Sequence, residues 1–252
     1  TSSGENSSPN FDSTSQRILF ISRQREAHKQ AQVYEFDLNN LTEKRITFQD
    51  GDCGSPIFSH DGKSILYTST TDELKERPAI LDVTKKTDNG SAETDPLPFD
   101  IYQSDLTGSK IERLTNRPGY DGDLFIRPDR PTSVIYSAWK NKKWDQYQLN
   151  IDNKSQIPLM EKAQFSIENM RISPHGKYWI WLEKSTVNKS FEVVLAKTNL
   201  KKERSLPLTD YEIESLTWGN DEVLLASMKL AKDKYFQIYS FDIMSGCLAP
   251  LI

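Results

Sequence analysis

The sequence predicts an all-β fold, a β-propeller of five four-stranded blades, with six blades as the alternative count. Three observations predict it: a strand-turn-strand pattern recurs, its copies keep a nearly constant period, and a second hairpin follows each copy. A repeat of about 45 residues with four strands is typical of a propeller blade. A β-sandwich does not repeat a hairpin at a fixed period. The anchor residues of the five copies are separated by 47, 68, 46 and 46 residues, and they are Phe11, Phe58, Ile126, Ile172 and Trp218.

The first hairpin of the repeat is clearest at 56–69 (PIFSHDGKSILYTS), where Asp61-Gly62 lies between two runs of apolar residues. Asp-Gly between such runs is a strong indicator of a β-hairpin. Further copies of the pattern occur at 9–22, 126–136, 172–181 and 218–225.

The second hairpin of each repeat begins with an alternating strand that ends in Asp or Asn plus an aliphatic residue. Its copies lie at 33–38, 101–106, 146–151 and 238–243, with a looser copy at 193–200. A short turn and a further strand follow, as in 110–115 (KIERLT). The patterning has period two throughout, so no amphipathic helix is expected.

Two segments fall outside the repeat. Residues 72–98 are polar, charged and proline-containing, and they are expected to form a loop inserted into the second blade, which explains the long spacing of 68. Residues 1–8 are rich in Ser, Gly and Asn and are expected to be a flexible tether. Residues 9–252 then form a single propeller domain.

The composition excludes several classes of protein. Mean hydropathy is −0.64, and no run of apolar residues is long enough for a transmembrane helix. The 32 basic residues against 36 acidic ones give a net charge of −4, which argues against nucleic acid as a partner, because a binder needs a basic surface to neutralise phosphates.

Short catalytic and metal-binding motifs are absent from the sequence: there is no phosphate-binding glycine loop, no GxSxG and no HExxH. Cys53 and Cys247 are too few for a disulfide scaffold. The repeat places them on different elements, so two free thiols are predicted, with Cys53 the more buried. Trp144 lies in the basic segment 140–145, which is expected to be an exposed hairpin tip, and it is the tryptophan expected either to bind a partner or to pack in the core.

The repeat, best seen at 56–69 and 100–115, resembles that of TolB-type propellers over almost the whole chain. The resemblance implies a propeller fold. The same repeat occurs in periplasmic binding proteins, in lid domains of serine peptidases and in lipoproteins. TolB carries an α/β domain before six blades and binds a peptidoglycan-associated lipoprotein; this sequence shows five repeats and no such domain, nor a hydrolase domain.

In a propeller, the first strand of each blade lines the central channel, and the loop that enters it opens on one face. Asp-Gly-Asp occurs twice in these loops, at 50–52 and 121–123, and is expected at the same structural position in both blades. Glu168 and Glu214 each precede their anchor by four residues. The candidate site residues are Asp50, Asp52, Tyr120, Asp121, Asp123, Glu168, Asp210, Tyr211, Glu212 and Glu214.

Convergent carboxylates repel one another, so such a ring raises some of their pKa values or recruits a hard cation such as Ca²⁺. With tyrosines beside it, the ring suits a cation, a basic peptide segment or a sugar. The alternative is that Asp-Gly is turn chemistry, with each Asp capping its own loop. The enzymatic alternative is a funnel-type carbohydrate-active hydrolase that uses paired carboxylates.

We therefore expect a non-enzymatic binding or scaffold propeller of the bacterial cell envelope. A protein or peptide partner is expected at the acidic face. No cofactor is expected apart from the Ca²⁺ alternative in the central channel. The protein is expected to be a monomer, periplasmic or tethered to the outer membrane through an N-terminal lipid anchor.

Overall fold

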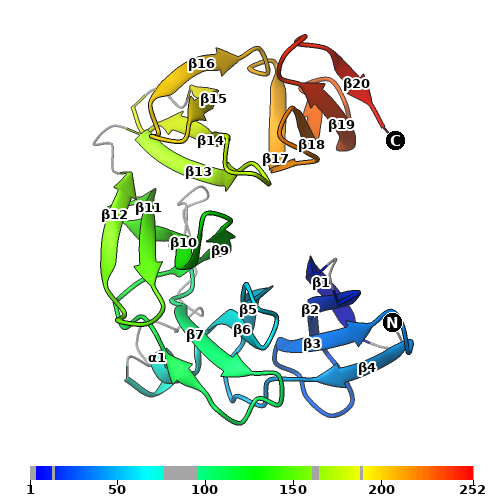
Figure 1. Cartoon of the computed structure of the whole chain (residues 1–252), viewed down its shortest axis with the longest axis vertical. Coiled ribbons are helices and arrows are strands. Elements are labelled where there is room, and N and C mark those ends of the chain that lie inside the picture. Colours follow the sequence, from blue (N-terminus) through cyan, green and yellow to red (C-terminus); the bar gives the residue numbers. More distant parts are fainter. Residues whose placement is uncertain (1–3, 13–14, 77–95, 161–164, 188–189, 252) are drawn as a thin grey trace, which may run out of the picture. The chain divides into compact units, whose positions relative to one another are not determined.

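The computed structural model describes residues 4–12, 15–76, 96–160, 165–187 and 190–251. In these ranges the chain forms five four-stranded antiparallel sheets, and each sheet joins four consecutive strands side by side in chain order (Figure 1). This is the strand arrangement of propeller blades. The all-β, five-bladed β-propeller predicted from the repeat is confirmed.

Each sheet is one repeat of the sequence. Blade 1 consists of β1 (Glu5–Asp12), β2 (Arg17–Arg23), β3 (Gln32–Asp37) and β4 (Thr42–Arg45). Blade 2 consists of β5 (Cys53–Phe58), β6 (Ser64–Ser69), β7 (Asp100–Asp105) and β8 (Glu112–Arg113). Blade 3 consists of β9 (Asp121–Arg127), β10 (Arg130–Lys140), β11 (Lys143–Asn150) and β12 (Gln156–Met160).

The last two blades follow the same order. Blade 4 consists of β13 (Phe165–Ile172), β14 (Tyr178–Ser185), β15 (Phe191–Lys197) and β16 (Lys202–Leu206). Blade 5 consists of β17 (Tyr211–Trp218), β18 (Val223–Leu230), β19 (Gln237–Asp242) and β20 (Leu248–Pro250).

The chain groups into two compact units. Unit 1 is Thr1–Ile126, Pro131–Lys142 and Gln148–Ile157, and unit 2 is Arg127–Arg130, Lys143–Tyr147 and Pro158–Ile252. In unit 1, blades 1 and 2 share a core that includes Leu19, Val33, Ile65 and Tyr67. In unit 2, blades 4 and 5 share one that includes Ile180, Leu195, Leu224 and Met228. Apolar burial between neighbouring sheets is therefore the main stabilising term within each unit.

A β-bulge interrupts the first strand of the blade. Pairing with the second strand shifts between Ser7 and Asn10 in β1, between Gly54 and Ile57 in β5, and between Glu168 and Arg171 in β13. A bulge leaves its residues without regular ladder partners, so proline is tolerated there. Pro9 and Pro56 occupy these places, which explains the proline of the repeat.

In blades 1 and 2, the R-[IL]-T triplet at the end of the fourth strand attaches this outer strand to the third strand. Thr47 Oγ1 accepts a hydrogen bond from the Val33 amide (2.8 Å), and Thr115 Oγ1 accepts one from the Ile101 amide (2.9 Å). The residue before each threonine is buried. The repeated triplet thus fixes the fourth strand to the third through one side-chain hydrogen bond.

The N-terminal strand begins earlier than the sequence predicts. Residues 5–8, expected to be part of a tether, belong to β1: Glu5 pairs with Arg23 and Ser7 with Ile21, and the Glu5 carboxylate lies 2.6 Å from Arg23 Nε. Backbone pairing does not require apolar side chains, so a polar composition does not exclude a strand. The boundary at residue 9 is corrected to Glu5; a single domain over the whole repeat region stays a prediction.

The start of the predicted insert forms a short helix, α1 (Thr71–Glu76), where no helix was expected. Asp72 accepts a hydrogen bond from Tyr102 Oη (2.7 Å), and Glu76 accepts one from Arg113 Nη1 (2.9 Å). These polar contacts attach α1 to blade 2. Residues 77–95 of the insert lie outside the described residues. Within the described ranges no helix has the length and apolar character needed to cross a membrane.

Candidate functional site

The predicted site residues lie in or directly before the first strands, and not in long loops. Asp50, Asp52, Tyr120 and Asp210 precede β5, β9 and β17, whereas Asp121, Asp123, Glu168, Tyr211, Glu212 and Glu214 lie within β9, β13 and β17. The loop expectation is wrong for these six residues. A strand that has one solvent-exposed side can contain polar residues. Polar residues therefore did not indicate where the loop ends and the strand begins.

The two Asp-Gly-Asp segments do not occupy the same position, contrary to the prediction. Cys53 N donates to Ala31 O (2.7 Å), and the equivalent bond in the next blade is from Asp121 N to Phe99 O (2.9 Å). The left-handed bulge residues agree with this alignment, since φ is +43° at Ser55 and +54° at Asp123. Asp121 therefore corresponds to Cys53, and the first Asp-Gly-Asp lies three residues earlier in its blade.

Asp52 has a local structural role. Its Oδ1 accepts a hydrogen bond from the Ala31 amide (2.7 Å), and its own amide donates to Thr70 Oγ1 (3.1 Å). These bonds tie the β2–β3 connection of blade 1 to blade 2. The Asp52 carboxylate thus has a structural partner, although this partner belongs to blade 1 and not to its own loop as the turn alternative supposed, while Asp50 is exposed.

Asp121 is the most deeply buried of the predicted carboxylates. Its Oδ1 lies 2.7 Å from Arg117 Nη2, and its Oδ2 has no hydrogen-bond partner among the described residues. Burial raises the pKa of Asp121 to about 6, against the opposing effect of Arg117. The guanidinium of Arg117 also lies over the Tyr136 ring, 5.6 Å from its centroid. Asp121 is thus a titrating group held inside the blade.

Tyr120 and Asp123 link blades 2 and 3 within unit 1. The Tyr120 ring packs edge-on against Phe99, with centroids 5.6 Å apart. Asp123 N donates to Ser55 Oγ (3.2 Å), and Asp123 Oδ2 accepts from Ser137 Oγ (3.4 Å). Burial raises the pKa of Tyr120 to about 12. Tyr120 is therefore packed in the protein and does not stand free beside a ligand.

Glycine at position 122 is required by Tyr120. A Cβ added to Gly122 would lie 2.4 Å from atoms of the Tyr120 ring, far inside van der Waals contact. The second Asp-Gly-Asp is thus explained by packing: the glycine lets the tyrosine ring lie flat against the strand.

Glu168 in blade 4 is engaged on its own sheet. Its Oε2 lies 2.6 Å from Lys184 Nζ on β14, and its Oε1 accepts from Ser166 Oγ (3.2 Å). The side chain retains 23% of its exposure. A ligand that uses Glu168 has to compete with Lys184.

The first strand of blade 5 is the most accessible of the predicted segments. Glu212 and Glu214 are exposed, Glu212 forms an ion pair with Lys229 (3.1 Å), and Glu214 accepts from Ser227 Oγ (2.8 Å). Tyr211 packs edge-on against Tyr239, with centroids 5.6 Å apart. Together with the exposed Asp210, these groups present an acidic strand edge with aromatic support.

In the described ranges, no three His, Cys, Asp or Glu side chains form a group that could bind a metal ion. The predicted thiols are confirmed: Cys53 is free and buried, and Cys247 is free and exposed.

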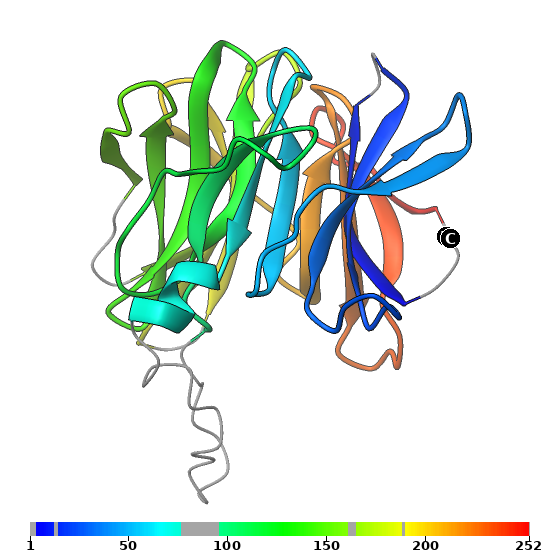
Figure 2. The ribbon, with the colours of Figure 1, turned by 90° about the horizontal axis from the view of Figure 1, so that it is seen from below.

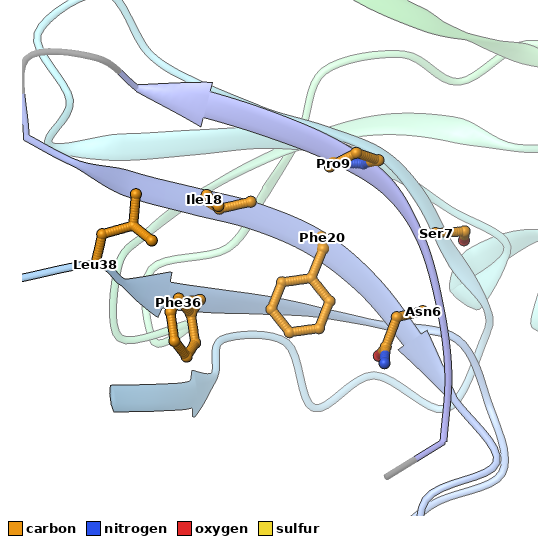
Figure 3. A pocket seen from close by; sticks show the side chains of 7 residues that line it. All are labelled: Asn6, Ser7, Pro9, Ile18, Phe20, Phe36 and Leu38. Carbon is orange, nitrogen blue, oxygen red and sulfur yellow. The ribbon is translucent and has the colours of Figure 1, made fainter. Parts of the chain in front are cut away.

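The sequence did not reveal an apolar cavity of about 350 Å³ on blade 1. Phe20 and Phe36 project side by side from β2 and β3, and Pro9 of the bulge lies across from them (Figure 3). Ile18 and Leu38 complete the apolar lining. The unbroken apolar run 18–21 (ILFI) could have indicated this cavity. A strand with apolar residues on both faces needs packing partners on both faces.

Comparison with known proteins supports the fold and leaves the function open. No protein-family model and no curated protein matches the sequence. TolB from Acinetobacter baumannii is similar in structure, with 20% identity and a TM-score of 0.69 over 97% of this chain and 53% of that one. This chain therefore spans about half the length of that TolB.

Two further structures have the same fold. A TolB described as putative, from Agrobacterium tumefaciens, shows 14% identity and a TM-score of 0.70, covering 99% of this chain and 81% of that one. Oligogalacturonate lyase from Vibrio parahaemolyticus shows 12% identity and a TM-score of 0.70, covering 100% and 66%. The resemblance to TolB-type propellers is confirmed at the level of fold, which binding proteins and enzymes share.

Proposed function

We propose that this chain is a non-enzymatic binding propeller of the bacterial cell envelope, which engages a protein or peptide partner along the first strands of its blades. The likeness of its fold to TolB propellers supports a periplasmic binding role. The proposal takes its specific content from the first strands, where the predicted site residues lie.

The observation that carries the proposal is the repeated bulge. One residue in the first strand of each of blades 1 to 4 has a left-handed backbone conformation, with φ between +43° and +54°: Ser8, Ser55, Asp123 and Asn169. In blades 1, 2 and 4 this residue lies in the bulge. Such conformations are unfavourable for residues other than glycine, and they gather at ligand clamps and active sites. Bulges also redirect side chains and end regular pairing next to functional sites. A strand with irregular pairing offers backbone and small polar groups to an extended peptide.

The charge of the exposed residues favours a basic segment in that peptide. Asp210, Glu212 and Glu214 follow one another at the start of blade 5, and all three are exposed. A lysine or arginine of the partner gains charge-assisted hydrogen bonds there.

The hydrolase alternative requires a pair of carboxylates free to act as acid and base. Asp52 is bonded to the Ala31 amide, Glu168 to Lys184 and Asp121 to Arg117. Each of these carboxylates would have to leave its partner before acting on a glycosidic bond. These three carboxylates are therefore less suited to act as acid and base than the exposed Asp50, Asp210 and Glu214.

A peptide-binding experiment tests the proposal. Binding of a fluorescein-labelled, lysine-rich extended peptide is measured by anisotropy for the wild type, for E212Q/E214Q and for the matched control E203Q/E222Q. We expect the first variant to bind roughly 10-fold or more weakly, because Glu→Gln replaces charge-assisted hydrogen bonds of about 1.5–3 kcal/mol by neutral ones of about 0.5–1.5 kcal/mol, and about 1.4 kcal/mol corresponds to a factor of ten. The control should bind like the wild type.

Two outcomes contradict the proposal. Equal affinities in all three proteins would remove the first strand of blade 5 from the site. Cleavage of oligosaccharides by the purified chain, lost in a carboxylate variant, would favour the enzymatic alternative.

A further inference from the structure

The hairpin between β18 and β19 of blade 5 has a charge opposite to that of the chain as a whole. Residues 229–236 read KLAKDKYF, with three lysines and two aromatic residues, in a protein of net charge −4. The hairpin projects from the end of its sheet, as the orange-red loop in Figure 2. It is a local basic and aromatic surface, and we call residues 229–236 the basic hairpin.

The one acidic residue of the basic hairpin is turned toward its own backbone. The Asp233 carboxylate accepts a hydrogen bond from the Leu230 amide (3.3 Å), and the Asp233 amide donates to Leu230 O (2.9 Å). The turn is therefore ordered by Asp233, and among the described residues its carboxylate forms no ion pair with Lys232 or Lys234.

The lysines are held beside aromatic rings. Lys229 Nζ lies 4.7 Å from the centroid of the Phe236 ring, and Lys234 Nζ lies 5.1 Å from that of Tyr235. Lys229 also pairs with Glu212 on β17. Within the described residues, no carboxylate lies in ion-pair distance of Lys232 or Lys234, and both are exposed. Two cations at the tip are thus available to an anionic partner.

An exposed aromatic side chain stands between these charges and the sheet. Tyr235 keeps 67% of its exposure, and a tyrosine combines a large apolar contact area with a hydroxyl group. Aromatic residues are enriched in the buried centres of protein interfaces. Lys232, Lys234 and Tyr235 therefore combine charge and apolar contact on one short turn.

We propose that the basic hairpin is a docking surface for an acidic peptide segment of a partner protein, one that carries an aromatic or aliphatic side chain among its carboxylates. The carboxylates pair with Lys232 and Lys234, and the apolar side chain packs on Tyr235. This surface adjoins the acidic first strand of the proposed function, which Lys229 contacts through Glu212, and it goes beyond that function, since it selects the opposite charge.

The chain as a whole disfavours the other polyanions. Nucleic acid binding draws on many phosphate contacts, whereas the hairpin offers two uncompensated lysines on a protein of net charge −4. Insertion into a membrane surface needs a larger apolar face, and Phe236 is covered in part by Lys229. An acidic peptide requires only the groups that the hairpin presents.

The test uses a fluorescein-labelled peptide of six Asp or Glu residues around one Phe, with anisotropy as the readout. We expect K232E/K234E to bind it roughly 10-fold or more weakly than the wild type, since charge reversal converts attraction into repulsion. The matched control K63E/K110E, with the same change in net charge on exposed residues of blade 2, should stay within about 2-fold of the wild type. Y235S should bind several-fold more weakly with an unchanged salt dependence. Circular dichroism verifies the fold of each variant.

Several results would overturn the proposal. An equal loss in K63E/K110E would show that only net charge matters. Absence of measurable peptide binding, or binding to phosphatidylserine vesicles or single-stranded DNA in its place, would show that the partner class is wrong. The lysine-rich peptide of the previous experiment serves as a cross-check, because K232E/K234E should not weaken it; the two proposals therefore fail separately.

Discussion

Replacement of Gly108 by alanine tests the close approach of blades 1 and 2. Gly108 lies in the turn between β7 and β8 with φ of +70°, and a Cβ added there would lie 1.9 Å from the carbonyl oxygen of Ile46. Gly246, in the corresponding turn of blade 5, has φ of +74° and nothing within 4 Å of an added Cβ. The two glycines thus share a backbone conformation and differ in their surroundings.

The difference separates two energetic terms. A left-handed conformation disfavours alanine by about 1–2 kcal/mol, so G246A should lower the free energy of unfolding by that amount. G108A carries the same term, and the clash adds roughly 1–3 kcal/mol, the usual range for overpacking a tightly packed site. The neighbour is a backbone carbonyl of the buried Ile46 and cannot turn away, so the turn itself has to move.

Urea unfolding followed by circular dichroism measures both variants. Asparagine tolerates left-handed φ, so G246N should be nearly neutral while G108N should remain destabilised by the clash. Equal losses for G108A and G246A, or a neutral G108N, would refute the contact between the β7–β8 turn and Ile46.

Three further predictions concern single buried or exposed groups. Ellman's reagent should react at once with the exposed Cys247 and reach Cys53, whose thiol pKa burial raises to about 11, only after unfolding; fewer than two thiols in denaturant without reductant would contradict this. The fully buried carboxylate of Asp100 lies 2.5 Å from Arg113. R113M should lower the free energy of unfolding by about 3–5 kcal/mol, because it leaves this carboxylate buried without its cation. The double variant D100N/R113M should recover most of the loss. Burial holds the pKa of Asp121 at about 6, above its unfolded value near 3.9, so the folded state binds more protons and stability should fall as pH rises from about 4 to 6. The stability of D121N relative to wild type should accordingly rise by about 2 kcal/mol across this range, and parallel pH profiles would contradict the shift.

The sequence predicted the blades because each repeat satisfies several local requirements at once. In the 56–69 hairpin the Asp61-Gly62 turn, the apolar runs on either side of it and the buried Phe58 all agree, although burial in these strands is nearly continuous where alternation was expected. The R-[IL]-T triplet was recognisable as a pattern, and its threonine hydroxyls explain why it recurs. Turn chemistry and burial indicate the same strands, so the repeat period was enough to predict the fold.

The candidate site was predicted less well because its residues depend on contacts that spacing does not encode. The two Asp-Gly-Asp segments look identical, yet one caps the Ala31 amide through Asp52 and the other buries Asp121 beside Arg117. Trp144 was expected at an exposed basic tip and is half-buried in β11. The basic hairpin of blade 5 was not predicted, since three lysines and two aromatic residues in one turn match none of the short motifs.

In the first strands of blades 1 to 4, one position has the same left-handed backbone conformation, although the residue type at this position differs. The left-handed position is Ser8 in blade 1, Ser55 in blade 2, Asp123 in blade 3 and Asn169 in blade 4. These side chains share small size and polarity, and Asn and Asp are among the residues that tolerate this region best. If packing alone set the position, glycine would serve with less strain. A small polar group is therefore retained together with the bulge, which is the expected pattern when the strand presents hydrogen-bonding groups to a ligand. Blade 5 departs from it, since its register shift falls between Ile213 and Ser215 without a left-handed residue, and the same blade carries the exposed acids and the basic hairpin. Under the proposed function, blade 5 would therefore bind its partner through long charged side chains, and the other blades through the backbone geometry of their first strands.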